Sequence, residues 1–183
     1  DNGGSSGRLR QELGIIPPGD LRHCLTAMAD REPLMERVMQ YRFEGTSPFA
    51  GHCFGNLFLA AIAETEGGME QGLQAASQIL KIRGRVIPST LSDIQLQAVM
   101  TDGTQVLGES EISEAGKQIA VLEMLPPDAP ATDSAVEAIE KANVLILGPG
   151  SLYTSVIPNL LVRGIRDAVV RSKAVKIYVC NVM

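Results

Sequence analysis

The sequence predicts an α/β protein with a three-layer α/β/α architecture, a mainly parallel sheet and a β-hairpin insertion. Residues 143–147 and 175–180 are continuous apolar runs separated by a helix-length segment, a pattern typical of parallel strands covered on both faces. Residues 94–101 instead alternate between apolar and polar, and the turn signal Asp102-Gly103 follows them. These two patterns predict the parallel sheet and the hairpin.

Composition bounds the class of protein. With 183 residues, 45% of them hydrophobic and 20% charged, the chain can form one globular domain with a core. A net charge of -5 and 4% aromatic residues argue against a nucleic-acid partner. The three separated cysteines, Cys24, Cys53 and Cys180, indicate free thiols. No run is long enough to cross a bilayer and no signal peptide opens the chain, so we expect a cytoplasmic protein without a membrane partner.

The two ends predict an internal fragment. The chain opens with the polar segment DNGGSSGR and closes with the apolar segment AVKIYVCNVM, with no element before the first or after the second. A buried parallel strand rarely ends a chain without its connection. We therefore expect residues 1–183 to form a single domain that is incomplete at both ends.

Helices are expected in the N-terminal half. Asp20 can cap a helix that follows Pro17-Pro18-Gly19, and a second short helix should follow Pro33. Residues 49–66 predict a longer, mostly buried helix that Gly67-Gly68 stops, and residues 69–82 predict its partner.

Strands are expected in the C-terminal half. After the alternating strand, residues 105–107 predict a return strand and residues 118–125 a further strand. Ser134-x-x-Glu137 is a capping box for a helix that ends near Ala142. The two apolar strands then enclose a helix that follows a glycine-containing turn.

That turn, residues 148–155, is the first candidate site and is called the glycine turn below. In a parallel sheet, ligands bind beyond the carboxyl ends of the strands, where glycines allow close approach and helix starts offer free N–H groups. Ser151, Thr154 and Ser155 add hydroxyls, although the spacing matches neither a Walker loop nor a dinucleotide fingerprint. The alternative is a structural turn between a strand and a helix.

The opening segment offers similar chemistry. Gly3 and Gly4 free the backbone, Ser5 and Ser6 can donate hydrogen bonds, and Arg8 can match a phosphate. A disordered polar terminus is the alternative.

Three polar residues within predicted helices are further candidates. Arg22 could pair with a carboxylate or bind a phosphate. His52 and Asn56 lie one helical turn apart on an apolar helix, so each needs a partner from the protein or from a ligand. A satisfied core histidine is the alternative. The spacings predict neither a zinc site nor a serine hydrolase.

Four segments in order, DNGGSSGRLRQELGIIPPGDLRHCL, GHCFGNLFLAAI, VIPSTLSDIQLQAVMTDG and GPGSLYTSVIPNLLVRGIRDAV, resemble the YvcK/CofD-like family, nearest to its gluconeogenesis-factor (YvcK) branch. The resemblance covers almost the whole chain and implies a Rossmann-like fold. The opening Gly-Gly-Gly-Thr-Gly turn and the later Thr-Gln-Pro-Gly segment of intact members are absent. Asp1 and Asn2 stand where relatives often have paired aspartates, Cys53 replaces a usual serine, and Arg163 replaces a common proline.

The resemblance implies two alternative functions. The YvcK branch looks like a nucleotide-sugar binder linked to gluconeogenic growth, cell shape and wall synthesis, with no established reaction. The CofD branch transfers a phospholactyl-type group from a guanosine diphosphate donor to a deazaflavin alcohol, with magnesium. We favour a regulatory UDP-sugar binder, with magnesium only under the transferase alternative, no catalytic or metal-ligating residue assigned, and homo-oligomer formation left open. The expected ligand contacts are Asp1, Asn2, Gly3, Gly4, Ser5, Ser6, Arg8, Arg22, His52, Asn56, Gly148, Gly150, Ser151, Leu152, Tyr153, Thr154 and Ser155.

Overall fold

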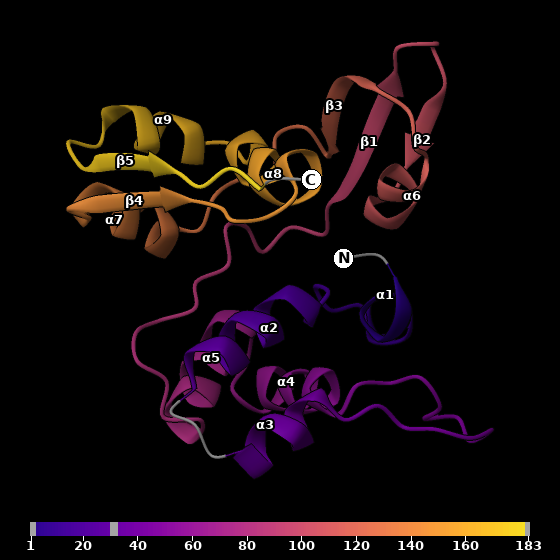
Figure 1. The fold of residues 1–183 in the computed structure, drawn as a ribbon. Helices are drawn as coiled ribbons and strands as arrows, with labels where there is room; N and C mark the ends of the chain where they lie inside the picture. Colours follow the sequence, from indigo (N-terminus) through magenta and orange to yellow (C-terminus); the bar gives the residue numbers. More distant parts are fainter. Residues whose placement is uncertain (1–2, 30–32, 182–183) are drawn as a thin grey trace. The chain divides into compact units, whose positions relative to one another are not determined.

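The computed structural model describes residues 3–29 and 33–181 (Figure 1). These residues fall into two compact units, Asp1–Pro88 and Ser89–Met183. The first unit contains helices and the second contains both sheets, so each is described by itself. The prediction of one domain that is incomplete at both ends stays a prediction.

The first unit is helical. Its elements are α1 (Gly4–Leu13), α2 (Gly19–Met28), α3 (Pro33–Gln40), α4 (Phe54–Thr65) and α5 (Met69–Ile79). The close packing of α4 against α5 depends on a glycine, because a Cβ atom at Gly72 would lie 2.7 Å from the Cα atom of Ala63.

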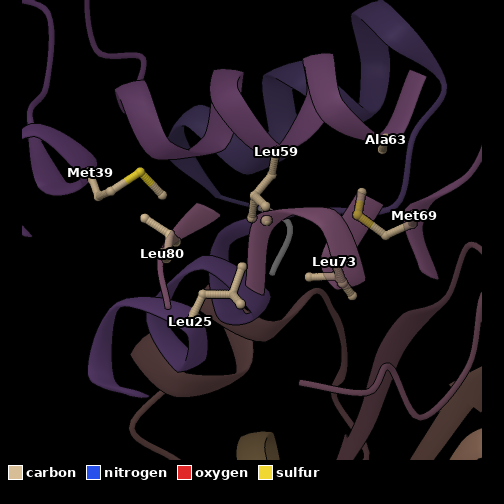
Figure 2. Close-up of a cluster of buried hydrophobic side chains, with 8 residues drawn as sticks. Leu25, Met39, Leu59, Ala63, Met69, Leu73 and Leu80 are labelled. Atoms are coloured by element: carbon tan, nitrogen blue, oxygen red, sulfur yellow. The ribbon is translucent and has the colours of Figure 1, made fainter. Parts of the chain in front are cut away.

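The core of the first unit lies between these helices (Figure 2). Each of its helices from α2 to α5 contributes at least one buried apolar side chain, and full burial of such a side chain is worth roughly 1.5–3 kcal/mol. The cluster consists of Leu25, Met39, Leu59, Ala63, Met69, Leu73, Ala76 and Leu80. It fixes α2 and α4, which carry Arg22 and Asn56.

The second unit contains an antiparallel sheet with the order β2-β1-β3. Its strands are β1 (Gln95–Met100), β2 (Gln105–Leu107) and β3 (Ile119–Leu125). Leu96, Ala98 and Met100 alternate with half-buried residues along β1, and they form a core with Ile112 of the helix α6 (Glu109–Glu114). The predicted hairpin and its alternation are confirmed.

A second sheet pairs β4 (Val144–Leu147) with β5 (Val175–Tyr178) in parallel, as predicted. The helices of this part are α7 (Asp133–Lys141), η1 (Leu152–Val156), α8 (Ile157–Leu161) and α9 (Ile165–Arg171). The α/β class is confirmed. One detail differs, because Val144, Ile146, Val175 and Ile177 are between 44% and 63% exposed, so one face of this strand pair is not covered within the described chain.

Three local expectations were wrong. The helix expected to begin at residue 49 begins at Phe54, because residues 41–53 form a narrow antiparallel arm in which Phe43 N–H donates to the carbonyl of His52 at 3.0 Å. Thr132, not Ser134, caps α7 and accepts from the N–H of Ala135. Asp20 lies within the first turn of α2, and Pro18 occupies its N-cap position.

Candidate functional site

The opening segment begins a helix. Gly3 is the N-cap of α1 and its carbonyl accepts from the N–H of Gly7 at 3.0 Å. Gly4 has φ +51°, a value that favours glycine. Ser5 and Ser6 are in the first turn and both are buried. A disordered loop is therefore excluded for residues 3–13, while the predicted contacts of Asp1 and Asn2 lie outside the described residues.

Ser5 connects α1 to the end of the arm. Its Oγ atom accepts from the N–H of Cys53 at 3.0 Å and lies 3.3 Å from Nδ1 of His52. Because the hydroxyl already accepts from Cys53, its own proton is available for Nδ1 of a neutral His52. His52 is buried and Cys53 is the N-cap residue of α4. This arrangement fits the satisfied core histidine that the sequence left open.

Ser6 belongs to a second chain of hydrogen bonds. Its Oγ atom accepts from Nδ2 of Asn56 at 3.1 Å, and Oδ1 of Asn56 accepts from Nε of Arg22 at 3.0 Å. The guanidinium also contacts Nε2 of His23 through Nη2. The two chains of hydrogen bonds, one from α1 to the arm and one through α1, α2 and α4, together contain five buried polar side chains. They are called the polar network below and consist of Ser5, Ser6, Arg22, His52 and Asn56.

Gly55 makes room for Arg22 against α4. A Cβ atom at this position would lie 2.6 Å from Cδ of Arg22 and 2.5 Å from the carbonyl oxygen of Met39. The sequence analysis missed this residue. The signal that could have found it is a glycine in the first turn of a strongly apolar helix, where glycine lowers helix stability unless close packing requires it.

The charge of Arg22 is the main electrostatic feature of the polar network. The side chain is 3% exposed, and a guanidinium keeps its charge in proteins. Within residues 3–29 and 33–181 its hydrogen-bond partners, Asn56 and His23, are not carboxylates, and no carboxylate forms an ion pair with it. No fully buried side-chain nitrogen or oxygen in that part of the chain lacks a hydrogen-bond partner. Nη1, which has none there, is therefore not fully buried.

Arg8 forms hydrogen bonds with the arm. Its Nη1 donates to the carbonyl of Ala50 at 2.6 Å and its Nη2 donates to the carbonyl of Pro48 at 2.9 Å. A third nitrogen, Nε, lies 3.9 Å from a carboxylate oxygen of Glu12. The guanidinium therefore holds the arm against α1, and the predicted phosphate contact of Arg8 stays a prediction.

Gly148 is required by the packing of the glycine turn. Its φ is +89°, and a Cβ atom there would lie 2.6 Å from the carbonyl oxygen of Val179. The Gly148–Pro149 peptide is cis. The N–H of Val179 donates to the carbonyl of Leu147 at 2.9 Å, so the chain after β5 runs directly beside the turn. At Gly148 the structure supports the interpretation of residues 148–155 as a structural turn.

The polar atoms of the turn serve the helix that follows. Oγ of Ser151 accepts from the N–H of Thr154 at 3.4 Å, and its carbonyl accepts from Ser155 and Val156 at 2.9 and 3.0 Å. Gly150 faces Ser155, because a Cβ atom there would lie 3.0 Å from the Cβ atom of Ser155. Among residues 151–155, the side chains left exposed are those of Leu152, Tyr153 and Ser155.

The candidates therefore form two groups. The polar network lies in the first unit and the glycine turn lies in the second. Across the described ranges, no group of three or more His, Cys, Asp or Glu side chains is arranged to hold a metal ion. None of the helices built from those residues is long and apolar enough to cross a membrane.

Comparisons with known proteins identify the family. The family model described as 2-phospho-L-lactate transferase CofD matches residues 1–183. A putative gluconeogenesis factor of Nostoc is 52% identical over the whole chain, and the gluconeogenesis factors of Halalkalibacterium halodurans and Bacillus subtilis are 49% and 44% identical. The chain spans 40%, 57% and 58% of the length of these three relatives.

A solved structure agrees with this result. The crystal structure of a Bacillus halodurans protein matches with a TM-score of 0.95 at 49% identity, covering all of this chain and 58% of that one. The resemblance that the four sequence segments indicated is confirmed over the full chain. Residues 1–183 belong to the CofD family, and the relatives that they match are named gluconeogenesis factors.

Proposed function

We propose that this protein is a gluconeogenesis factor that acts as a regulatory binder of a nucleotide sugar, with a UDP-sugar as the ligand. Its role is the maintenance of cell shape and cell-wall synthesis during gluconeogenic growth. One structural observation carries the binding proposal. Arg22 is a buried cation, it has no carboxylate partner within the described chain, and its Nη1 is not fully buried.

The physical argument starts from the cost of burying a charge. A buried ion without a counter-ion is unfavourable by several kcal/mol, so a site of this kind favours an anion. Arg22 is tied through Asn56 to Ser6, which lies in the first turn of α1, where the helix carries a partial positive charge. A diphosphate carries two negative charges and accepts hydrogen bonds from guanidinium and backbone N–H groups alike.

The glycine turn of the second unit is a candidate ligand surface by itself. Its exposed Leu152 and Tyr153 side chains offer apolar surface for a base or a sugar ring, and Ser155 offers a hydroxyl. Tyrosine is suited to this use because one ring presents both a flat apolar face and a polar group. Contacts of Gly148, Gly150, Ser151 and Thr154 with a ligand are proposed for the glycine turn alone.

Calorimetry on the full-length protein tests the proposal with UDP-N-acetylglucosamine and, separately, with GDP. We expect the UDP-sugar to bind and Arg22→Gln to weaken it roughly 10- to 100-fold, the range for a charged hydrogen bond. Arg171→Gln is the matched control, because it removes the same charge from an exposed residue that pairs with Glu140. Circular dichroism checks that both variants fold. Equal affinities of the Arg22 and Arg171 variants would contradict the proposal.

A second function is favoured by one observation, the description of the matching family model as a 2-phospho-L-lactate transferase. Under this alternative the protein uses a guanosine diphosphate donor, a deazaflavin acceptor and magnesium. The test is turnover by the full-length protein incubated with all three. Turnover would establish the transferase, and its absence together with UDP-sugar binding would favour the regulatory binder.

A further inference from the structure

We propose that anion binding at Arg22 is coupled to protonation of His23, so that the protein takes up a proton together with its ligand. The proposal rests on the proposed function, because the anion is the diphosphate of the nucleotide sugar. It makes His23 a proton-linked positioning residue of the site.

The contact between the two side chains favours the neutral form of His23 in the free protein. Nη2 of Arg22 meets Nε2 of His23, and a guanidinium can only donate. Nε2 must therefore accept, which requires the neutral imidazole with its proton on Nδ1. A proton added to Nε2 would replace this hydrogen bond with two donors facing each other.

Arg22 cannot turn away at low cost. Its Nε is held by Oδ1 of Asn56 at 3.0 Å, and Asn56 is held in turn by Ser6. Its aliphatic stem passes Gly55 at a distance that leaves no space for a methyl group. The guanidinium is therefore held beside His23.

The charges around His23 have a net effect that favours the neutral form. Burial lowers the pKa of His23, the cation of Arg22 lowers it further, and Arg42 of the arm adds to this, while Asp20 on the same helix opposes it. These three are the ionisable groups that act on the imidazole among the described residues. His23 is itself exposed, so solvent screens part of each interaction.

A bound diphosphate reverses the balance. Its negative charge offsets Arg22, removes the repulsion that opposes protonation, and provides an acceptor for a new Nε2–H donor. The pKa of His23 is then higher in the complex than in the free protein. By linkage, the proton adds to ligand affinity below the free-state pKa, and this contribution is lost as the pH rises through the bound-state pKa.

UDP-N-acetylglucosamine is a suitable probe because both of its phosphates are esterified and neither titrates between pH 5 and 8. Calorimetry on the full-length protein in buffers with different heats of ionisation measures the protons taken up. We expect net uptake of less than one proton and an affinity roughly three- to tenfold higher at pH 5.5 than at pH 8, below the limit of tenfold per pH unit for one proton. His23→Gln keeps an acceptor that does not titrate, and we expect it to bind with no such uptake.

Nuclear magnetic resonance gives an independent readout. The imidazole signal of His23, assigned by its absence in His23→Gln, should titrate at higher pH when the UDP-sugar or sulfate, a dianion across this range, is bound. Binding with identical proton uptake in the wild type and in His23→Gln would overturn the coupling and leave the proposed function standing. Absence of binding by both ligands at every pH would overturn both proposals.

Discussion

The polar network of the first unit and the glycine turn of the second are built in opposite ways. In the network, five polar side chains from three elements and the arm are at most 3% exposed, and they bond to one another across 34 to 50 residues of sequence. In the turn, the hydrogen bonds stay within a few residues, and three of the side chains face outward. One region is held by tertiary contacts and the other by local geometry.

The difference shows where a ligand contact and a structural role can be separated. Hydrogen bonds of the polar network have two roles. The groups that would hold Arg22 for a ligand also join α1, α2 and α4, and so contribute to stability. A change there alters stability and binding together. Backbone glycines decide the stability of the turn, while its exposed side chains are free to change binding alone. Four comparisons of variants test this contrast.

Gly55→Ala should have the largest effect. The added methyl group would lie 2.5 Å from a backbone oxygen and 2.6 Å from Arg22, and neither can move without disturbing the network. We expect a loss of about 3 kcal/mol in the free energy of unfolding, together with loss of UDP-sugar affinity. Urea denaturation measures the first and calorimetry the second. Ala61→Gly, at an exposed position of the same helix, is the control and should cost about 1 kcal/mol without affecting affinity.

Gly148→Ala should follow, with a loss of about 2–3 kcal/mol. The residue combines φ +89° with a clash against the carbonyl of Val179. Gly103 is a matched control, because its φ is +84° and nothing lies within 4 Å of an added Cβ. Gly103→Ala should therefore cost only the conformational part, about 1–2 kcal/mol. Equal losses in the two variants would show that the clash with Val179 is relieved.

Ser6→Ala and Ser155→Ala compare a buried hydroxyl with an exposed one. Removal of the Ser6 hydroxyl leaves Nδ2 of Asn56 without its acceptor inside the protein, for which we expect a loss of about 1–2 kcal/mol. Ser155 is exposed, so its loss should stay within about 0.5 kcal/mol. Thermal unfolding of both variants measures the contrast. A larger loss of stability in Ser155→Ala than in Ser6→Ala would contradict this prediction.

Ser151→Ala should have the smallest effect. Its hydroxyl accepts from Thr154 at 3.4 Å, a long hydrogen bond for a helix cap, and we expect about 0.5 kcal/mol. Thr132→Ala removes the shorter cap of α7, 3.2 Å, and should cost about 1 kcal/mol. Urea denaturation of the pair ranks them. If Ser151→Ala keeps its stability but weakens UDP-sugar binding, the hydroxyl contacts the ligand.

Short-range patterns were sufficient for much of the fold. Alternation along residues 95–100, the Asp102-Gly103 turn and the apolar runs of β4 and β5 each gave the element that forms, because these signals depend on neighbours in the chain. The four family segments likewise gave the family. The N-cap residue of a helix was harder to predict. Thr132 and Ser134 are both residue types that cap helices, and the local sequence does not show which of the two caps α7.

The sequence alone determined that His52 and Asn56 are polar residues in an apolar segment and therefore require partners, and that Arg22 brings a charge to a predicted helix. Only the tertiary structure decided what those partners are: Ser5 for His52, Ser6 and Arg22 for Asn56, and backbone carbonyls of the arm for Arg8. The reason is that these contacts join helices far apart in the sequence, and their geometry depends on how apolar cores bring the helices together. Gly55 is a further residue whose role depends on the tertiary structure. A side chain is excluded at this position because Arg22 packs against it.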